Sequence, residues 1–164
     1  MTQSSSKLTI IGRAEKADLA TIDAVQVPVK IDTGADACSI WAHMTYVREG
    51  NLYVIFFGEG SEFYTGKEHV FTKDEYSLTR VANSFGHREI RYKVKLRIKV
   101  KGRTINGSFT LSDRSKKLYP VLIGRSLLLH KFLVDVSRGE PLKEAEERRA
   151  KRLQEELNLN EGMQ

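Results

Sequence analysis

The chain has 164 residues, of which 40% are hydrophobic, and carries a formal net charge of +6. This length suits one domain with a sizeable core. The single cysteine, Cys38, excludes an internal disulfide, and no apolar run is long enough to cross a bilayer, so we expect a cytoplasmic protein. Residues 1–7 are polar, unlike a secretion signal, and we expect them to be disordered. The excess of basic residues favours anionic partners.

Short segments with strand-like patterns follow one another along the chain. They are Leu8–Gly12, Asp18–Ile31, Cys38–His43, Leu52–Phe57, His69–Phe71, Ser77–Val81, Glu89–Val100, Thr104–Leu111, Tyr119–Ile123 and Phe132–Val136. The turn Lys101–Arg103 predicts a hairpin between the two strands beside it. We expect one short helix over Ser126–His130. Many short strands with a single helix predict an all-β barrel, with Phe132–Val136 closing the sheet.

Apolar and basic residues alternate from Lys93 to Lys101. One face of this strand carries Val94, Leu96, Ile98 and Val100, and the other carries five positive charges. The basic face is explained by solvation, with lysines that also prevent pairing between sheet edges. The alternative is a docking surface for RNA or an acidic protein tail. Since no aromatic residues alternate with these cations to stack on bases, we expect nucleic acid not to be a partner.

The last part of the chain has a different composition. The segment Glu140–Leu157 is rich in glutamate, arginine, lysine and leucine, which favour helices. Its apolar stripe is narrow. We therefore expect a charged helical tail over residues 139–164, either solvated or packed on a partner or on a second copy of the chain.

The most informative segment is Asp32-Thr33-Gly34-Ala35-Asp36. It follows Val25–Ile31, in which apolar residues occupy every second position as in a half-buried strand. Such a strand delivers one carboxylate to the floor of a cleft, and the glycine permits a tight turn. Phosphatases of the haloacid type also place an aspartate at a strand end, but they need a second aspartate where this chain has Gly34.

This loop resembles the active-site loop of aspartic peptidases, in the form with alanine after glycine that retroviral enzymes carry. Leu122-Ile123-Gly124-Arg125 resembles the run that follows the flap of retropepsins. The chain is most similar to a bacterial retropepsin-like family labelled "ATP-dependent zinc protease", which is linked with ATP-grasp ligases. The matching segments are Lys30–Ala35, Gly86–Glu89, Leu111–Ser115, Leu122–Arg125 and Phe132–Asp135. The resemblance implies a closed acid-protease barrel over residues 8–138, with a flap expected between Gly66 and Arg91. Because this segment is longer and more polar than a glycine-rich retroviral flap, it is either a lid of a different shape or not a lid.

Aspartic peptidases need two carboxylates that share one proton. This chain supplies one such loop, so the resemblance implies a homodimer in which Asp32 faces Asp32 of the second copy. Thr33, Gly34 and Ala35 would support the loop, with Thr33 bonding across the symmetry axis. The resemblance also implies a bidentate ion pair between Arg125 and Asp36, which holds the loop or contacts substrate.

No cofactor and no metal site are expected. The segment His87–Arg91 does not have the His-Glu-x-x-His spacing that binds zinc, and no phosphate-binding Gly-Lys-Ser/Thr loop is present. The ATP and zinc of the family label would therefore belong to a neighbouring ligase, or to nothing. We expect Cys38 to be a buried small residue and not a nucleophile, because no histidine lies near it in sequence.

The sequence thus predicts an aspartic endopeptidase that acts on peptides or proteins as a homodimer. The alternative is a peptidase-like module without catalytic activity, which binds an acidic or glutamate-extended tail and assists an ATP-grasp ligase or the modification of a ribosomal protein. An RNA-binding β-domain is a third reading.

Overall fold

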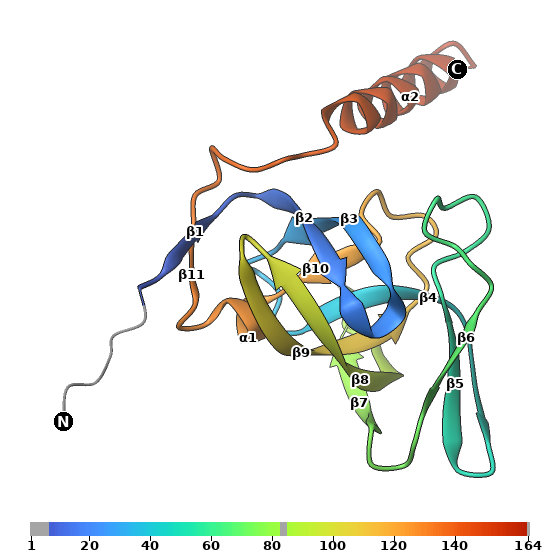
Figure 1. The fold of residues 1–164 in the computed structure, drawn as a ribbon. Helices are drawn as coiled ribbons and strands as arrows, with labels where there is room; N and C mark the ends of the chain where they lie inside the picture. Colours follow the sequence, from blue (N-terminus) through green and yellow to red (C-terminus); the bar gives the residue numbers. More distant parts are fainter. Residues whose placement is uncertain (1–6, 83–84, 164) are drawn as a thin grey trace.

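The computed structural model describes residues 7–82 and 85–163 (Figure 1). In these described residues, eleven strands alternate with few helices. The strands are β1 Thr9–Ile11, β2 Ala14–Leu19, β3 Ala24–Ile31, β4 Cys38–Arg48, β5 Asn51–Phe56, β6 Glu68–Phe71, β7 Tyr76–Ala82, β8 Arg88–Val100, β9 Arg103–Ser112, β10 Val121–Ile123 and β11 Phe132–Val134. The helices are the 3-10 turn η1 Ala20–Ile22, α1 Arg125–Leu128 and α2 Lys143–Glu161. Within the described residues, no helix combines the length and the apolar character that crossing a membrane requires.

Six strands form a closed barrel in the order β10-β3-β2-β8-β9-β4, because β10 pairs with both β3 and β4. This confirms the predicted all-β barrel. The prediction that Phe132–Val136 closes the sheet is wrong. β10 closes the barrel instead, because it pairs in parallel with β3 and antiparallel with β4. β11 pairs in parallel with β1 in a separate two-stranded sheet.

The core follows the alternation seen in the sequence where strands are regular. In β8 the residues Val94, Leu96, Ile98 and Val100 are all at most 1% exposed, as predicted. In β3 the predicted core residues Val27, Val29 and Ile31 are buried, but Pro28 is buried as well and Val25 is 65% exposed. Gln26 has a positive φ of 54° and the pairing of β2 with β3 shifts register nearby, so the first residues of β3 are rotated out of the pattern.

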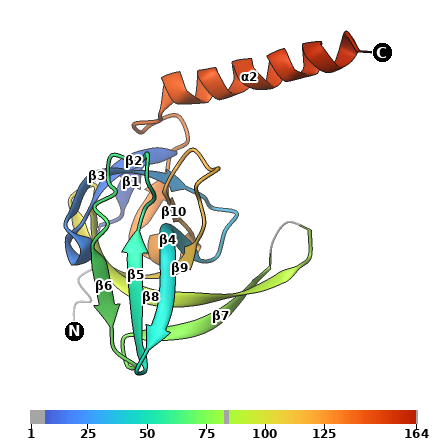
Figure 2. The ribbon, with the colours of Figure 1, turned by 90° about the vertical axis from the view of Figure 1, so that its right-hand side faces the viewer.

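The hairpin of β7 and β8 begins inside the segment predicted as a flap, residues 66–91, and continues past its end. It projects far from the barrel (Figure 2). β7 pairs along its whole length with the first half of β8, from Tyr76 opposite Val94 to Ala82 opposite Arg88. Among the described residues, β7 has no other strand neighbour. The hairpin is therefore a two-stranded arm that can overhang a site on the barrel.

Helix α2 extends away from the barrel (Figures 1 and 2), and none of its residues is buried. The predicted helix is present, although it runs from Lys143 to Glu161. Its first turn is anchored by Glu146, which accepts hydrogen bonds from Arg13 at 3.0 and 3.1 Å and from the Tyr119 hydroxyl at 2.9 Å. These bonds hold the pKa of the Glu146 carboxyl below its usual value. The disorder predicted for residues 1–7 falls almost entirely outside the described residues.

Candidate active site

The Asp32 loop begins where β3 ends, and its backbone is held by the neighbouring strand β10. The Asp32 amide donates to the Ile123 carbonyl at 2.9 Å. The half-buried Asp32 carboxylate accepts from the Gly34 amide at 2.9 Å, and the Ala35 amide bonds back to the Asp32 carbonyl at 3.3 Å. The loop thus presents one carboxylate in a defined orientation.

Helix α1 braces the other side of the loop. The Arg125 amide donates to the Ala35 carbonyl at 2.8 Å, and the Ser126 amide donates to the Asp36 carbonyl at 3.0 Å. Position 124, directly before the helix, requires glycine because a side chain does not fit there. A Cβ at this position would lie 2.4 Å from the Ala37 carbonyl oxygen. Cys38 lies beneath this contact, where its Sγ accepts from the Gly124 amide at 3.4 Å. Cys38 is fully buried, as expected, and burial raises the pKa of its thiol.

The structure brings Arg125 and Asp36 together, but not in the predicted geometry. One Arg125 Nη lies 3.9 Å from one carboxylate oxygen of Asp36, and both side chains are more than half exposed. The other Nη donates to the Thr33 carbonyl at 2.9 Å. The predicted bidentate pair is therefore wrong in this conformation. Arg125 holds the loop mainly through the Thr33 backbone, and the exposed ion pair contributes little.

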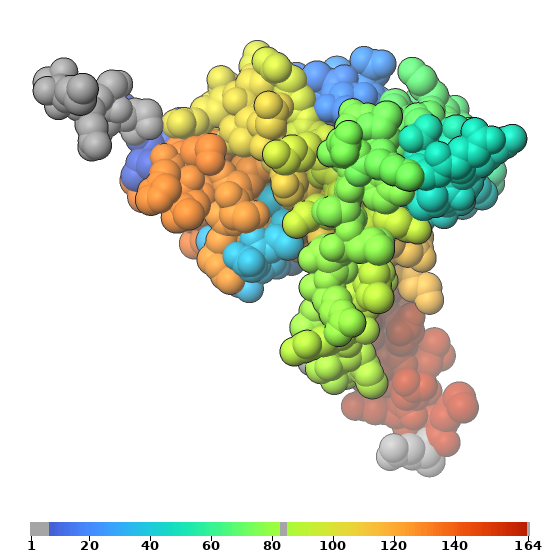
Figure 3. Space-filling model, turned by 90° about the horizontal axis from the view of Figure 1, so that it is seen from below, coloured from blue at the N-terminus to red at the C-terminus, as the bar shows by residue number. Residues whose placement is uncertain are grey.

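An open cleft of about 910 Å³ lies beside the loop, between it and the β7–β8 hairpin. Seen from below, the loop and the segment of α1 lie next to each other, and the hairpin crosses the same face (Figure 3). The cleft is lined by Gly34, Ala35, Asp36, Ala37, Ser39, Thr79, Arg80, Val81, Ala82, Arg91, Lys93, Ser108, Thr110, Ser112, Asp113, Arg114, Lys117, Leu122 and Ser126. An extended peptide placed there would run past the residues that follow Asp32.

The lining of this cleft is strongly basic. Five of its residues are cationic and two are acidic, namely Arg80, Arg91, Lys93, Arg114 and Lys117 against Asp36 and Asp113. Among the described residues, no ion pair includes Arg114 or Lys117. Because an unpaired cation in a cleft attracts a carboxylate, this lining favours an acidic ligand.

Two of the arginines that line the cleft, Arg91 and Arg114, are partly buried. Arg114 is half-buried, and its Nε donates to the Tyr119 carbonyl at 3.0 Å. Burial and the charge of Arg91 lower the pKa of Arg114, against the opposing effect of the Asp32 carboxylate. Arg91 pairs with Glu89 at 3.2 Å, but its buried Nε has no hydrogen-bond partner among the described residues. Arg114 therefore interacts electrostatically with both Arg91 and Asp32.

The sequence did not point to Arg91 or Arg114 as site residues. The only signal was that Arg114 lies in Leu111–Ser115, one of the segments similar to the retropepsin-like family. No pattern in the sequence shows that the end of β9 and the start of β8 meet beside the Asp32 loop.

Metal ligands do not gather in the part of the chain that the structure describes, where no three histidine, cysteine, aspartate or glutamate side chains are placed to hold an ion.

Comparisons with known proteins agree with this fold. A family model described as "RimB-like: Retropepsin-like aspartic endopeptidase RimB" matches residues 10–144. A crystal structure of a Legionella pneumophila protein of unknown function is similar in fold, with a TM-score of 0.59 and 24% identity over 81% of this chain and 97% of that chain. No curated protein matches the sequence.

Proposed function

We infer that this chain, which belongs to the RimB-like family of retropepsin-like aspartic endopeptidases, is itself a peptidase that works as a homodimer. The observation that carries this proposal is the Asp32 loop, whose half-exposed carboxylate is oriented by Gly34 and braced by β10 and α1 beside an open cleft. One carboxylate does not suffice for this chemistry, and a second copy would supply the other.

In the proposed reaction, a water molecule lies between the two Asp32 carboxyl groups, of which one is ionised and one protonated. The ionised group takes a proton from the water as it attacks the scissile carbonyl carbon, and the protonated group donates to the carbonyl oxygen. When the C–N bond of the resulting intermediate breaks, the carboxyl group that took the water proton donates it to the amine nitrogen, and the other carboxylate takes back a proton from a hydroxyl of the intermediate as the product carboxyl group forms. Since the two groups share one proton, they titrate as a coupled pair.

Thr33 and Arg125 have supporting roles in this proposal. Thr33 is exposed at the tip of the loop, where its side chain is free to meet its equivalent in a second copy. Its carbonyl is held by Arg125 at 2.9 Å, which fixes the backbone on which that contact depends. Gly34 and Ala35, the two residues after Thr33, line the cleft.

The cations of the cleft indicate an acidic peptide as substrate. We expect Arg114→Gln to raise KM for a glutamate-rich peptide by roughly tenfold, because one charge-assisted contact contributes about 1.5–3 kcal/mol. KM for a neutral peptide should change little. Steady-state cleavage kinetics with both peptides would measure the difference.

Arg48→Gln is the matched control for this prediction, since Arg48 is an exposed arginine on β4 that does not line the cleft. An equal rise in KM for both peptides, or no rise at all, would contradict an acidic substrate bound by Arg114.

The homodimer is tested by the solution mass together with the effect of dilution on activity. We expect specific activity to fall as the protein is diluted below the dissociation constant of the dimer, and the measured mass to shift from two chains to one over the same range. A strict monomer with undiminished cleavage would overturn the proposal, because each chain holds a single Asp32 loop.

A second candidate is a binding module without catalysis. The basic cleft favours it equally well, because an acidic or glutamate-extended tail can be held there without being cut. Such a module would assist an ATP-grasp ligase. Binding of a glutamate-rich peptide by the dimer with no detectable cleavage, and with stimulation of a ligase that survives Asp32→Asn, would favour this candidate.

A further inference from the structure

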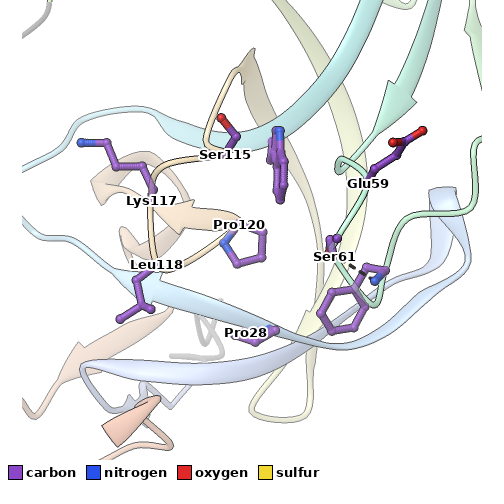
Figure 4. A pocket seen from close by; sticks show the side chains of 10 residues that line it. Pro28, Glu59, Ser61, Ser115, Lys117, Leu118 and Pro120 are labelled. Atoms are coloured by element: carbon purple, nitrogen blue, oxygen red, sulfur yellow. Dashed lines mark hydrogen bonds between the residues drawn. The ribbon is translucent and has the colours of Figure 1, made fainter. Parts of the chain in front are cut away.

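A second pocket lies on the barrel outside the cleft, between the loop that follows β5 and the loop that precedes β10. It measures about 380 Å³, and Asp32 and its loop are not among the residues that line it. Its apolar lining consists of Pro28, Trp41, Phe63, Leu118 and Pro120. Figure 4 shows Lys117 and Leu118 on one side, Glu59 and Ser61 on the opposite side, and Pro120 between them.

The walls of this pocket are fixed by the fold. Trp41 lies in β4. Its amide donates a hydrogen bond to the Pro120 carbonyl at 2.9 Å, and its carbonyl accepts one from the Phe57 amide at 2.9 Å. Its indole ring packs closely against Gly58, since a Cβ on that glycine would lie 2.4 Å from the ring. Phe63 packs on the buried Phe57, with ring centroids 5.7 Å apart. The pocket is therefore preformed and needs little rearrangement to receive a ligand.

The position of the pocket indicates what occupies it. Lys117 lines the pocket and also lines the basic cleft, so one short loop separates the two sites. A peptide that leaves the cleft over Lys117 arrives at the apolar walls. The size of the pocket and its indole and proline walls fit one aromatic side chain, because flat rings stack favourably on such surfaces.

We propose that the Trp41 pocket binds an aromatic side chain of the same protein substrate whose acidic segment occupies the cleft. This inference rests on the proposed function for the acidic segment only. The substrate is then recognised at two places. Its acidic segment binds the cations of the cleft near Asp32, and its aromatic side chain, some residues away along the substrate, binds the apolar Trp41 pocket. Two moderate contacts on one chain give selectivity that neither provides alone.

The experiment uses the fact that Trp41 is the sole tryptophan of the chain. Blocked peptides with six glutamates, a flexible glycine–serine linker and a terminal phenylalanine are titrated into the Asp32→Asn variant, which prevents cleavage. A second peptide has glycine in place of the phenylalanine. We expect the phenylalanine peptide to change Trp41 emission and to bind roughly tenfold more tightly, in line with burial of one aromatic side chain. The glycine peptide should bind without changing the emission.

Leu118→Ala removes one wall of the pocket and should reduce the advantage of the phenylalanine peptide to about threefold or less. Val25→Ala, at a site 65% exposed elsewhere on the barrel, is the control and should leave the advantage intact. Equal binding of both peptides with unchanged Trp41 emission overturns the pocket proposal. A Trp41 response to phenylalanine that persists when the glutamates are replaced by serines, without loss of affinity, overturns the acidic substrate and leaves the pocket supported.

Discussion

Asp32→Asn is expected to lower kcat for peptide cleavage by at least about 10³-fold, within the range that loss of a positioned acid or base produces. Asparagine keeps the size of the side chain and can still accept the bond from the Gly34 amide, which is 2.9 Å from the carboxylate. The barrel should therefore remain folded, and circular dichroism should match that of the unmodified protein. Steady-state kinetics with a glutamate-rich peptide would measure the loss.

The matched control is Asp23→Asn, an exposed aspartate with a positive φ of 53° that asparagine also tolerates. It should leave kcat unchanged. Mixing Asp32→Asn chains with unmodified chains gives a sharper test, because only dimers with two intact loops would cleave. Activity should then fall with the square of the unmodified fraction. A linear decrease would mean that each chain acts by itself, which contradicts a shared pair of carboxylates.

The parts of the fold that the sequence predicted well depend on local patterns. The alternation in β8 identifies its buried face because each side chain of a regular strand points opposite to the next. The turn at Gly102 likewise places the β8–β9 hairpin correctly. The expectation of a loop at the end of β3 also rests on a local signal, a strand-like segment followed by Asp-Thr-Gly.

The errors lie where the structure depends on distant segments. Nothing local distinguishes β10 from β11 as the strand that closes the barrel; β10 takes that place because both β3 and β4 have free edges there. The rotation of Val25 out of the core depends on how β2 and β3 align around Gln26. Pairing between strands far apart in sequence decides both cases.

The candidate site divides in the same way. The carboxylate and its supporting glycine follow from one short motif, whereas the cations beside them come from β8 and from the segment after β9. Arg91 and Arg114 are separated by more than twenty residues and meet only because the hairpin and the barrel wall enclose one cleft. The specificity of the proposed enzyme is therefore less visible in the sequence than its chemistry.

Gly124→Ala is expected to cause the largest loss of stability of any single methyl addition near the site. The added Cβ would lie 2.4 Å from the Ala37 carbonyl oxygen and 2.8 Å from the Ala35 carbonyl oxygen. Both neighbours are backbone, so the loop itself must move. Overpacking of this kind costs about 3 kcal/mol, which corresponds to a fall in Tm of roughly 6–12 °C for a chain of this size. Thermal unfolding followed by circular dichroism would measure it.

Gly162→Ala is the control for this prediction, since its φ is −73° and a Cβ there would lie 3.6 Å or more from its neighbours. It should leave Tm almost unchanged. At temperatures where Gly124→Ala is still folded, we expect kcat to remain reduced by at least about tenfold. The hydrogen bond from the Arg125 amide to the Ala35 carbonyl must shift with the loop, and this shift misplaces Asp32. A folded Gly124→Ala variant with normal kcat would show that α1 stabilises the barrel without positioning the carboxylate.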